Sequence, residues 1–107
     1  MTVYNYSTGV TINLSQLQLY INVTQPSGQE LNAITFGGVT IWSGVITGSP
    51  AVISAFSGNV SIAPGASKLL QLTFKKNYNT NGTERILVDF AENGCPQLDS
   101  SNSSQLP

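Results

Sequence analysis

The chain has 107 residues, only 8% of them are Asp, Glu, Lys or Arg, and the formal net charge is −1. Single domains most often have about 100–150 residues, and about 25% of residues are charged in an average protein. Four scattered basic residues cannot neutralise a run of phosphates, which excludes nucleic acid as a partner. A weakly charged surface of hydroxyl and amide groups is typical of secreted, cell-surface and virion proteins, so we expect an extracellular or cell-surface location.

The first strands are indicated by alternation of apolar and polar residues. A short β-prone run over Thr2–Tyr6 ends at a Ser-Thr-Gly turn. Between residues 10 and 23 the apolar residues stand at even positions up to Leu14 and at odd positions from Leu17 onward. Because a shift of one residue turns a strand inside out, we expect a bulge or a change of sheet at Ser15-Gln16.

Two turns are predicted in the middle of the chain. Gly37-Gly38 separates strand candidates at 31–36 and 39–42, and both glycines can adopt positive φ in a two-residue hairpin. In Ala63-Pro64-Gly65, proline presets φ and glycine supplies a left-handed residue. Short strands are expected between these turns, over residues 51–56 and 59–62.

The last two strands have the clearest alternation, over residues 70–74 and 86–90. The polar loop between them contains Tyr78, the aromatic residue that we expect to be exposed. After residue 96 the sequence is rich in Ser and Asn and has no periodicity. We therefore expect a domain over residues 1–96 and a flexible tail or linker over residues 97–107.

Seven or eight short strands without a credible helix predict an all-β, two-sheet sandwich. The inward-facing residues of these strands should form one core between the sheets. We predict this core to contain Leu17, Leu19, Ile21, Ile34, Phe36, Trp42, Leu70, Leu72, Phe74, Ile86, Val88 and Phe90.

The residues for catalysis are largely missing. The chain has no histidine and a single cysteine, Cys95, which excludes the common Ser-His-Asp and Cys-His systems, the usual zinc ligands and an intrachain disulfide. Glu84 and Asp89 differ in parity, so they would face opposite sides of one strand. Asp89, Glu92 and Asn93 could offer oxygen ligands to calcium, but we favour a solvated turn. We expect neither an enzyme nor a cofactor.

Asn-x-Ser/Thr triplets are abundant, and such triplets accept glycans only in a glycosylating secretory route. They begin at Asn5, Asn13, Asn22, Asn59, Asn81 and Asn102. The first residues show neither the basic nor the apolar region of a signal peptide, and no run of 18 apolar residues occurs. If the protein is exported, we expect this sequence to be a mature form or an excised domain that does not insert into the membrane.

Three segments resemble extracellular immunoglobulin-like domains of prokaryotic surface and pilin-like proteins. Ile62–Phe74 has the pattern I-x-P-G-x-S-x-x-L-x-L-x-F, and Ile34–Gly44 and Val88–Cys95 resemble other parts of such modules. The resemblance covers about residues 1–95. It implies an immunoglobulin-like sandwich of seven to eight strands with no catalytic motif.

We expect a structural module that forms a filament, pilus or surface layer with copies of itself or with other surface proteins. The candidate interface comprises apolar residues outside the expected core: Val3, Tyr4, Tyr6, Leu69 and Leu87. One alternative is a module that binds carbohydrate or an adhesion target through exposed aromatic residues, although we expect Trp42 to pack in the core. The other alternative is a virion capsid or decoration protein.

Overall fold

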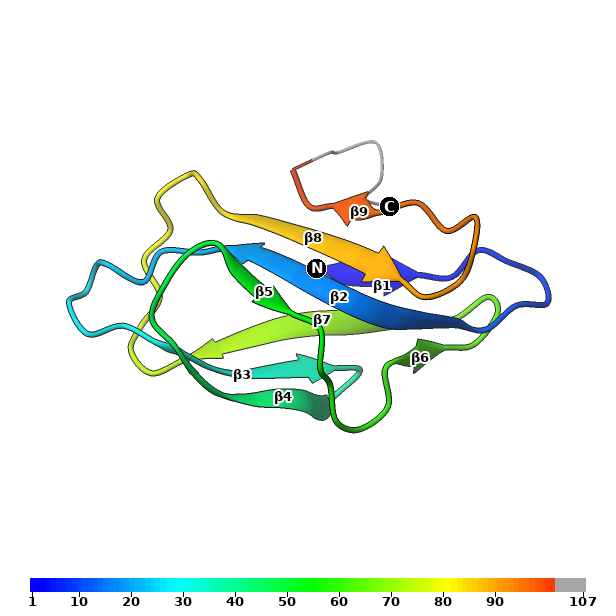
Figure 1. Cartoon of the computed structure of the whole chain (residues 1–107), viewed down its shortest axis with the longest axis horizontal. Helices are drawn as coiled ribbons and strands as arrows, with labels where there is room; N and C mark the ends of the chain where they lie inside the picture. Colours follow the sequence, from blue (N-terminus) through cyan, green and yellow to red (C-terminus); the bar gives the residue numbers. More distant parts are fainter. Residues whose placement is uncertain (102–107) are drawn as a thin grey trace.

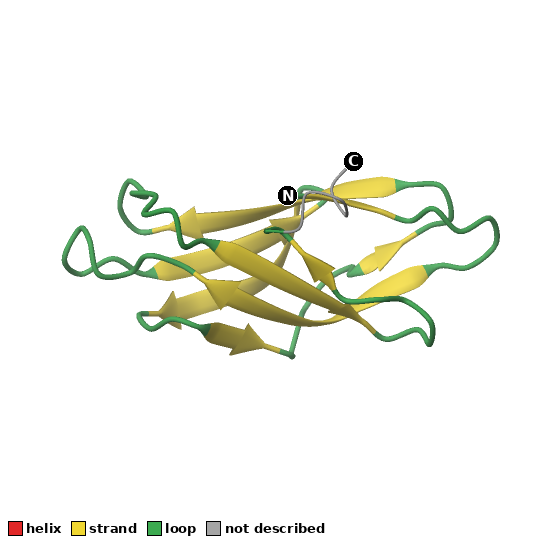
Figure 2. Ribbon diagram, turned by 90° about the horizontal axis from the view of Figure 1, so that it is seen from above, coloured by secondary structure: helices red, strands yellow, loops and turns green. Residues whose placement is uncertain are grey.

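The computed structural model of the chain describes residues 1–101, and this part is all-β with no helix. Its strands are joined by loops, several of which extend from the two ends of an elongated molecule (Figures 1 and 2). The strands are β1 (Thr2–Tyr4), β2 (Ile12–Tyr20), β3 (Leu31–Phe36), β4 (Val39–Ile46), β5 (Ala51–Ile53), β6 (Ser61–Ile62), β7 (Ser67–Phe74), β8 (Arg85–Phe90) and β9 (Leu98–Asp99). Accordingly, the described residues include no helix that could cross a membrane.

The strands form two antiparallel sheets. The four-stranded sheet has the order β1-β7-β3-β4, so β1 and β4 are its edges. The five-stranded sheet has the order β5-β2-β8-β9, and β6 pairs with the other end of β2. The predicted all-β, two-sheet arrangement is therefore confirmed, with nine strands in residues 1–101 where we expected seven or eight.

The predicted irregularity in β2 is a bulge. Leu14 pairs with Phe90 and Gln16 pairs with Asp89, so Ser15 is the extra residue. The strand stays in one sheet on both sides of the bulge. Leu14 and the odd-numbered residues from Leu17 to Val23 are therefore all buried, as the change of phase predicted.

Both predicted turns are confirmed. Gly37 and Gly38 have φ of +60° and +81°, and the flanking residues of the hairpin pair with each other. A Cβ atom on Gly37 would lie 2.9 Å from Cδ of Lys68, so a side chain there would have to move the lysine, and the positive φ independently favours glycine. In the second turn, the Ala66 N–H donates to the Ala63 carbonyl at 3.0 Å.

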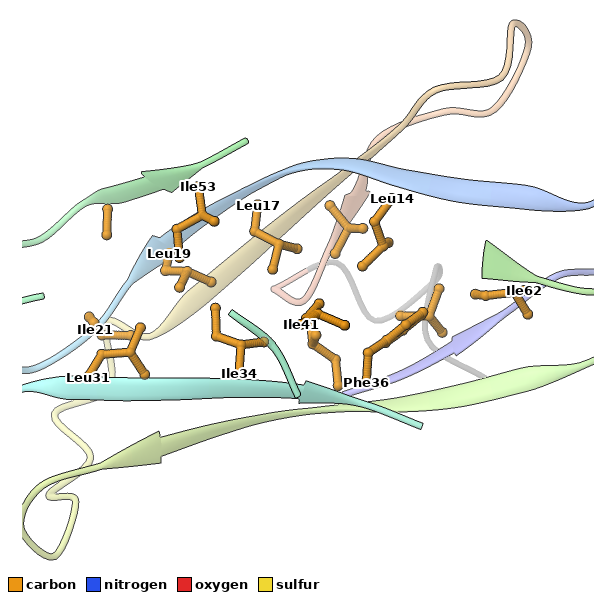
Figure 3. Close-up of a cluster of buried hydrophobic side chains, with 14 of the residues drawn as sticks. Leu14, Leu17, Leu19, Ile21, Leu31, Ile34, Phe36, Ile41, Ile53 and Ile62 are labelled. Atoms are coloured by element: carbon orange, nitrogen blue, oxygen red, sulfur yellow. The ribbon is translucent and has the colours of Figure 1, made fainter. Parts of the chain in front are cut away.

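The core lies between the two sheets. Figure 3 shows Leu17 and Leu19 of β2 above Ile34 and Phe36 of β3. Seven of the twelve predicted core residues are buried; the other five, Phe74 among them, are half-buried and pack against the cluster. The prediction left out nine further buried members of the cluster. These are Val3, Ile12, Leu14, Val23, Leu31, Ile41, Ala51, Ile53 and Ile62.

Tyr78 is half-buried, so our prediction of an exposed side chain is wrong. Its ring packs on Phe74 with the centroids 4.4 Å apart. Its hydroxyl accepts a hydrogen bond from the Asn22 N–H at 2.7 Å and donates one to Glu84 at 2.8 Å. Burial raises the pKa of Tyr78. The loop after β7 folds back onto the sandwich because this phenol ties it to the loop after β2.

The predicted tail does not begin at residue 97. Residues 98 and 99 form β9 beside β8, and the Ser100 N–H donates to the Ile86 carbonyl at 2.9 Å. Arg85 and Asp99 form an ion pair across the two strands at 2.5 Å. Residues up to 101 therefore belong to the sheet region, and the rest of the predicted tail lies outside the described residues.

Candidate functional site

Exposed apolar side chains lie along opposite edges of the molecule. Among the described residues, the large ones are Tyr4, Tyr6, Val10, Val39, Val45, Val52 and Leu69. Tyr4 lies on β1, and Tyr6 and Val10 lie in the segment that follows it. Leu69 lies on β7, where it pairs with Thr2 of β1. The other three lie on β4 and on β5, which is an edge of the five-stranded sheet. Both edges of the four-stranded sheet therefore carry exposed apolar residues.

Among residues 1–101, β7 is the one strand that pairs with β1, so the outer side of the β1 backbone has no strand partner there. Met1 accepts a hydrogen bond from the Leu70 N–H at 2.8 Å, and the Asn5 N–H donates to the Ala66 carbonyl at 2.9 Å. Because backbone groups alternate in direction along a strand, the N–H and C=O groups of Thr2 and Tyr4 point away from β7. An unpaired edge of this kind can accept another strand.

The side chain of Asn5 anchors the segment that follows β1. It is only 3% exposed, and its Nδ2 donates to the carbonyls of Val10 at 2.8 Å and Ile62 at 2.9 Å. Its Oδ1 accepts a hydrogen bond from the Ser7 N–H at 3.0 Å. These bonds fix the loop against β6. Tyr6 therefore leaves the sheet at a defined position.

A stacked pair of tyrosines stands on this edge. The rings of Tyr4 and Tyr6 are nearly parallel, with their centroids 5.5 Å apart, and Tyr6 is 77% exposed. Beside them is an open, mainly apolar groove of about 400 Å³, lined by the segment that follows β1 and the segment that follows β8. Its apolar walls include Tyr4, Tyr6 and Val10 on one side and Phe90, Cys95 and Leu98 on the other. Cys95 is a half-buried free cysteine.

The carboxylates near this groove are engaged by protein donors. Glu92 accepts hydrogen bonds from the Asn13 backbone N–H at 2.6 Å and from its Nδ2 at 2.9 Å. These bonds, the side-chain one foremost, lower the pKa of Glu92. Asp89 accepts a hydrogen bond from Gln97 at 3.0 Å. Across residues 1–101, no group of three or more Cys, Asp or Glu is placed to hold a metal ion.

The β4 edge is covered only at its beginning. The Ser57 N–H donates to the Ile41 carbonyl at 2.8 Å, so the segment between β5 and β6 runs beside the start of β4. In the part of the chain that the structure describes, no strand lies beyond Ser43–Ile46, and Val45 is 64% exposed there. The second half of β4 is therefore a second open edge.

The five residues predicted for the interface divide into two groups. Tyr4, Tyr6 and Leu69 are exposed, and their role in assembly stays a prediction. Val3 is 0% exposed within the core, and Leu87 is 8% exposed between its partners on β2 and β9. Our expectation that these two lie uncovered is therefore wrong.

The prediction also missed four exposed residues, Val10, Val39, Val45 and Val52. Val10 has the parity of the inward-facing residues of β2, but it precedes the strand. Its position directly after the Ser-Thr-Gly turn is the signal that could have placed it in the loop. Comparisons of the chain with models of protein families, with curated proteins and with solved structures find no match.

Proposed function

We propose that the chain is a non-catalytic, immunoglobulin-like module of the cell exterior, and that it polymerises with copies of itself into a filament, pilus or surface layer. The observation that carries the proposal is the pair of open edges on the four-stranded sheet, each with exposed apolar side chains. The β1 edge of one copy would meet the β4 edge of the next, continuing the sheet through backbone hydrogen bonds.

A contact between two different edges determines the form of the assembly. When unlike surfaces meet and the rotation between copies does not close a ring, each added copy presents the same free edge again and the polymer stays open. A contact between two β1 edges would instead stop at a dimer. The opposite positions of β1 and β4 in one sheet therefore favour a filament.

The sequence of both edge strands supports this proposal. Proteins usually protect exposed edges with charged residues or proline. Neither β1 (Thr2–Tyr4) nor β4 (Val39–Ile46) contains a charged residue or a proline. With a net charge of −1 for the whole chain, electrostatic repulsion between copies is weak.

Two variants that each block one edge test the proposal. Tyr6→Lys adds a charge at the β1 edge, and Val45→Lys adds one at the β4 edge. We expect the unmodified chain to polymerise in sedimentation velocity and negative-stain microscopy, and each variant alone to stay monomeric. An equimolar mixture of the two should form a dimer, because one open β1 edge meets one open β4 edge. Thr73→Lys, on an exposed residue of β7 away from both edges, is the matched control and should still polymerise.

Other outcomes would contradict this contact. An unmodified chain that sediments as a monomer at high concentration refutes polymerisation. If Val45→Lys alone forms a dimer, the contact joins two β1 edges. Closed shells in the microscope would favour a capsid or decoration protein.

A carbohydrate- or adhesion-binding module is the second candidate. It is favoured by the exposed ring of Tyr6 beside an apolar groove, since aromatic rings can stack on sugars. In that case the folded monomer should bind an oligosaccharide in titration calorimetry, and Tyr6→Ala should abolish the binding while Tyr20→Ala, on β2, should not.

A further inference from the structure

The asparagine triplets fall into two structural groups. Five of the six begin within the described residues, and the sixth, at Asn102, lies outside them. In four of these five, Oδ1 accepts a hydrogen bond from the backbone N–H two residues later, as at Asn59 and Asn81. The turn around Oδ1 therefore does not distinguish the triplets. The triplets differ instead in the surroundings of Nδ2, the atom that would carry a glycan.

Two of the asparagines are structural members of the fold. Nδ2 of Asn5 donates both of its hydrogens to buried or partly buried carbonyls, and the residue is 3% exposed. Nδ2 of Asn22 donates to the Asn79 carbonyl at 2.9 Å, and this residue is 6% exposed. A glycan on either nitrogen would have to occupy space that the folded chain fills.

Asn13 differs in its partner. Its triplet lies within β2, and its Nδ2 donates to the Glu92 carboxylate at 2.9 Å, a charge-assisted bond. A glycan on this nitrogen would leave it one hydrogen, and the sugar would have to fit beside Glu92, which also accepts from the Asn13 backbone, on a strand that is paired with β6 at this position.

Asn59 and Asn81 have the opposite arrangement. Both are exposed and lie in loops, between β5 and β6 and between β7 and β8. Their Oδ1 atoms also accept a hydrogen bond from the hydroxyl of the third triplet residue, at 2.6 Å from Ser61 and 2.5 Å from Thr83. In the described part of the chain, neither Nδ2 donates a hydrogen bond to the protein. The reactive nitrogen therefore faces solvent at both sites.

We propose that Asn59 and Asn81 are acceptor sites for an asparagine-linked glycan, whereas Asn5, Asn13 and Asn22 stay unmodified in the folded protein. The co-reactant is an oligosaccharide on a lipid pyrophosphate, transferred by an oligosaccharyltransferase. The bond between the first sugar carbon and the pyrophosphate oxygen breaks and a bond from that carbon to Nδ2 forms. Nδ2 loses one proton, and the lipid pyrophosphate leaves. This inference does not depend on polymerisation.

The test is secretion of the full chain, behind a cleavable signal peptide, from a eukaryotic cell that glycosylates. Folded protein from the medium is treated with an endoglycosidase that leaves one N-acetylhexosamine on each occupied asparagine. Peptide mass spectrometry then locates these tags. Because each tag is a retained sugar, spontaneous deamidation at Asn81-Gly82 is not mistaken for glycosylation of Asn81. We expect tags on Asn59 and Asn81 and none on the other three asparagines that the structure describes.

Variants that change only the third triplet residue give the matched comparison. Ser61→Ala should remove the tag from Asn59, and Thr83→Ala should remove the tag from Asn81. Ser7→Ala, in the triplet of Asn5, should change nothing. A tag on Asn5, Asn13 or Asn22 in folded, secreted protein overturns the inference. So does an untagged Asn59 or Asn81 when a co-secreted reporter glycoprotein is fully occupied.

Discussion

Replacing Asn5 with alanine should remove an anchor that holds the β1 edge to the rest of the molecule. The variant loses the two bonds from Nδ2 and the bond from the Ser7 N–H. It also leaves the carbonyl of Ile62, a residue that is 0% exposed, without this donor. A neutral hydrogen bond contributes about 1 kcal/mol net, and a buried polar group left unpaired costs about 1–3 kcal/mol. We expect the free energy of unfolding to fall by about 3 kcal/mol, a large part of the roughly 5–15 kcal/mol typical of a domain.

Urea unfolding followed by tryptophan fluorescence measures this loss, with Asn59→Ala as the matched control. Asn59 accepts its two hydrogen bonds from Ser61 at the exposed surface. An exposed substitution of this kind usually changes the free energy of unfolding by less than about 0.5 kcal/mol. If Asn5→Ala is no more destabilising than Asn59→Ala, the anchoring role of Asn5 is refuted.

Asn5→Asp separates the hydrogen bonds from the packing. The aspartate has nearly the same shape, but a second oxygen would replace the Nδ2 that donates to Val10 and Ile62. At neutral pH a nearly buried carboxylate would face two carbonyl oxygens, so we expect Asn5→Asp to be less stable than Asn5→Ala. Acid should recover part of the difference, because a protonated carboxyl can donate one hydrogen bond. A variant as stable as the unmodified chain at pH 7 would contradict this account.

Further predictions concern the hairpin, the outer faces and pH. Gly37→Ala should lower the free energy of unfolding by about 1–2 kcal/mol, since a residue with a side chain is strained at φ +60°, and an unchanged urea midpoint would count against this. Leu69→Lys, at an exposed site, should lower the free energy of unfolding by less than about 0.5 kcal/mol, whereas Leu87→Lys, at a buried site, should lower it by at least about 2 kcal/mol. Equal losses would contradict the assigned burial. Hydrogen bonds lower the pKa of Glu92 and, mainly through Arg85, that of Asp99. The stabilisation that these two carboxylates give the folded state is fully present above their unfolded pKa of about 4. It is lost as the pH falls from there through the lowered pKa of the folded state, so the urea midpoint should be lower at pH 3 than at pH 7.

The alternation of apolar residues predicted those features that depend on the local direction of side chains. The bulge at Ser15 followed from the change of phase in one strand, because two apolar sets of opposite parity can face one core only if a residue is inserted. The hairpin at Gly37 followed from the need for positive φ. Both features involve residues that are adjacent in sequence, which is why the sequence alone was sufficient.

Parity could not predict what covers a side chain. Leu87 points away from the core, as its parity indicated, but it lies between paired strands, one of which is β9. The two residues of β9 have no periodic signal, and the ion pair from Arg85 to Asp99 spans 14 positions. Tyr78 likewise contacts Asn22 across 56 positions. Such pairings depend on the packing of the whole chain, so they became visible only in the structure.

The lengths of the edge strands would affect how a polymer of this domain bends. In the described chain, the outer strands of the five-stranded sheet have three residues in β5 and two each in β6 and β9, whereas the two edges of the four-stranded sheet have eight residues in β4 and three in β1. If copies join through the four-stranded sheet alone, backbone hydrogen bonds connect the four-stranded sheets of neighbouring copies. The five-stranded sheets of the same copies then touch without hydrogen bonds between them. Bending that separates the unbonded layer breaks no hydrogen bonds, while bending the opposite way presses the neighbouring five-stranded sheets together. The filament would therefore have a preferred sign of curvature, with the outer face of the four-stranded sheet on the concave side.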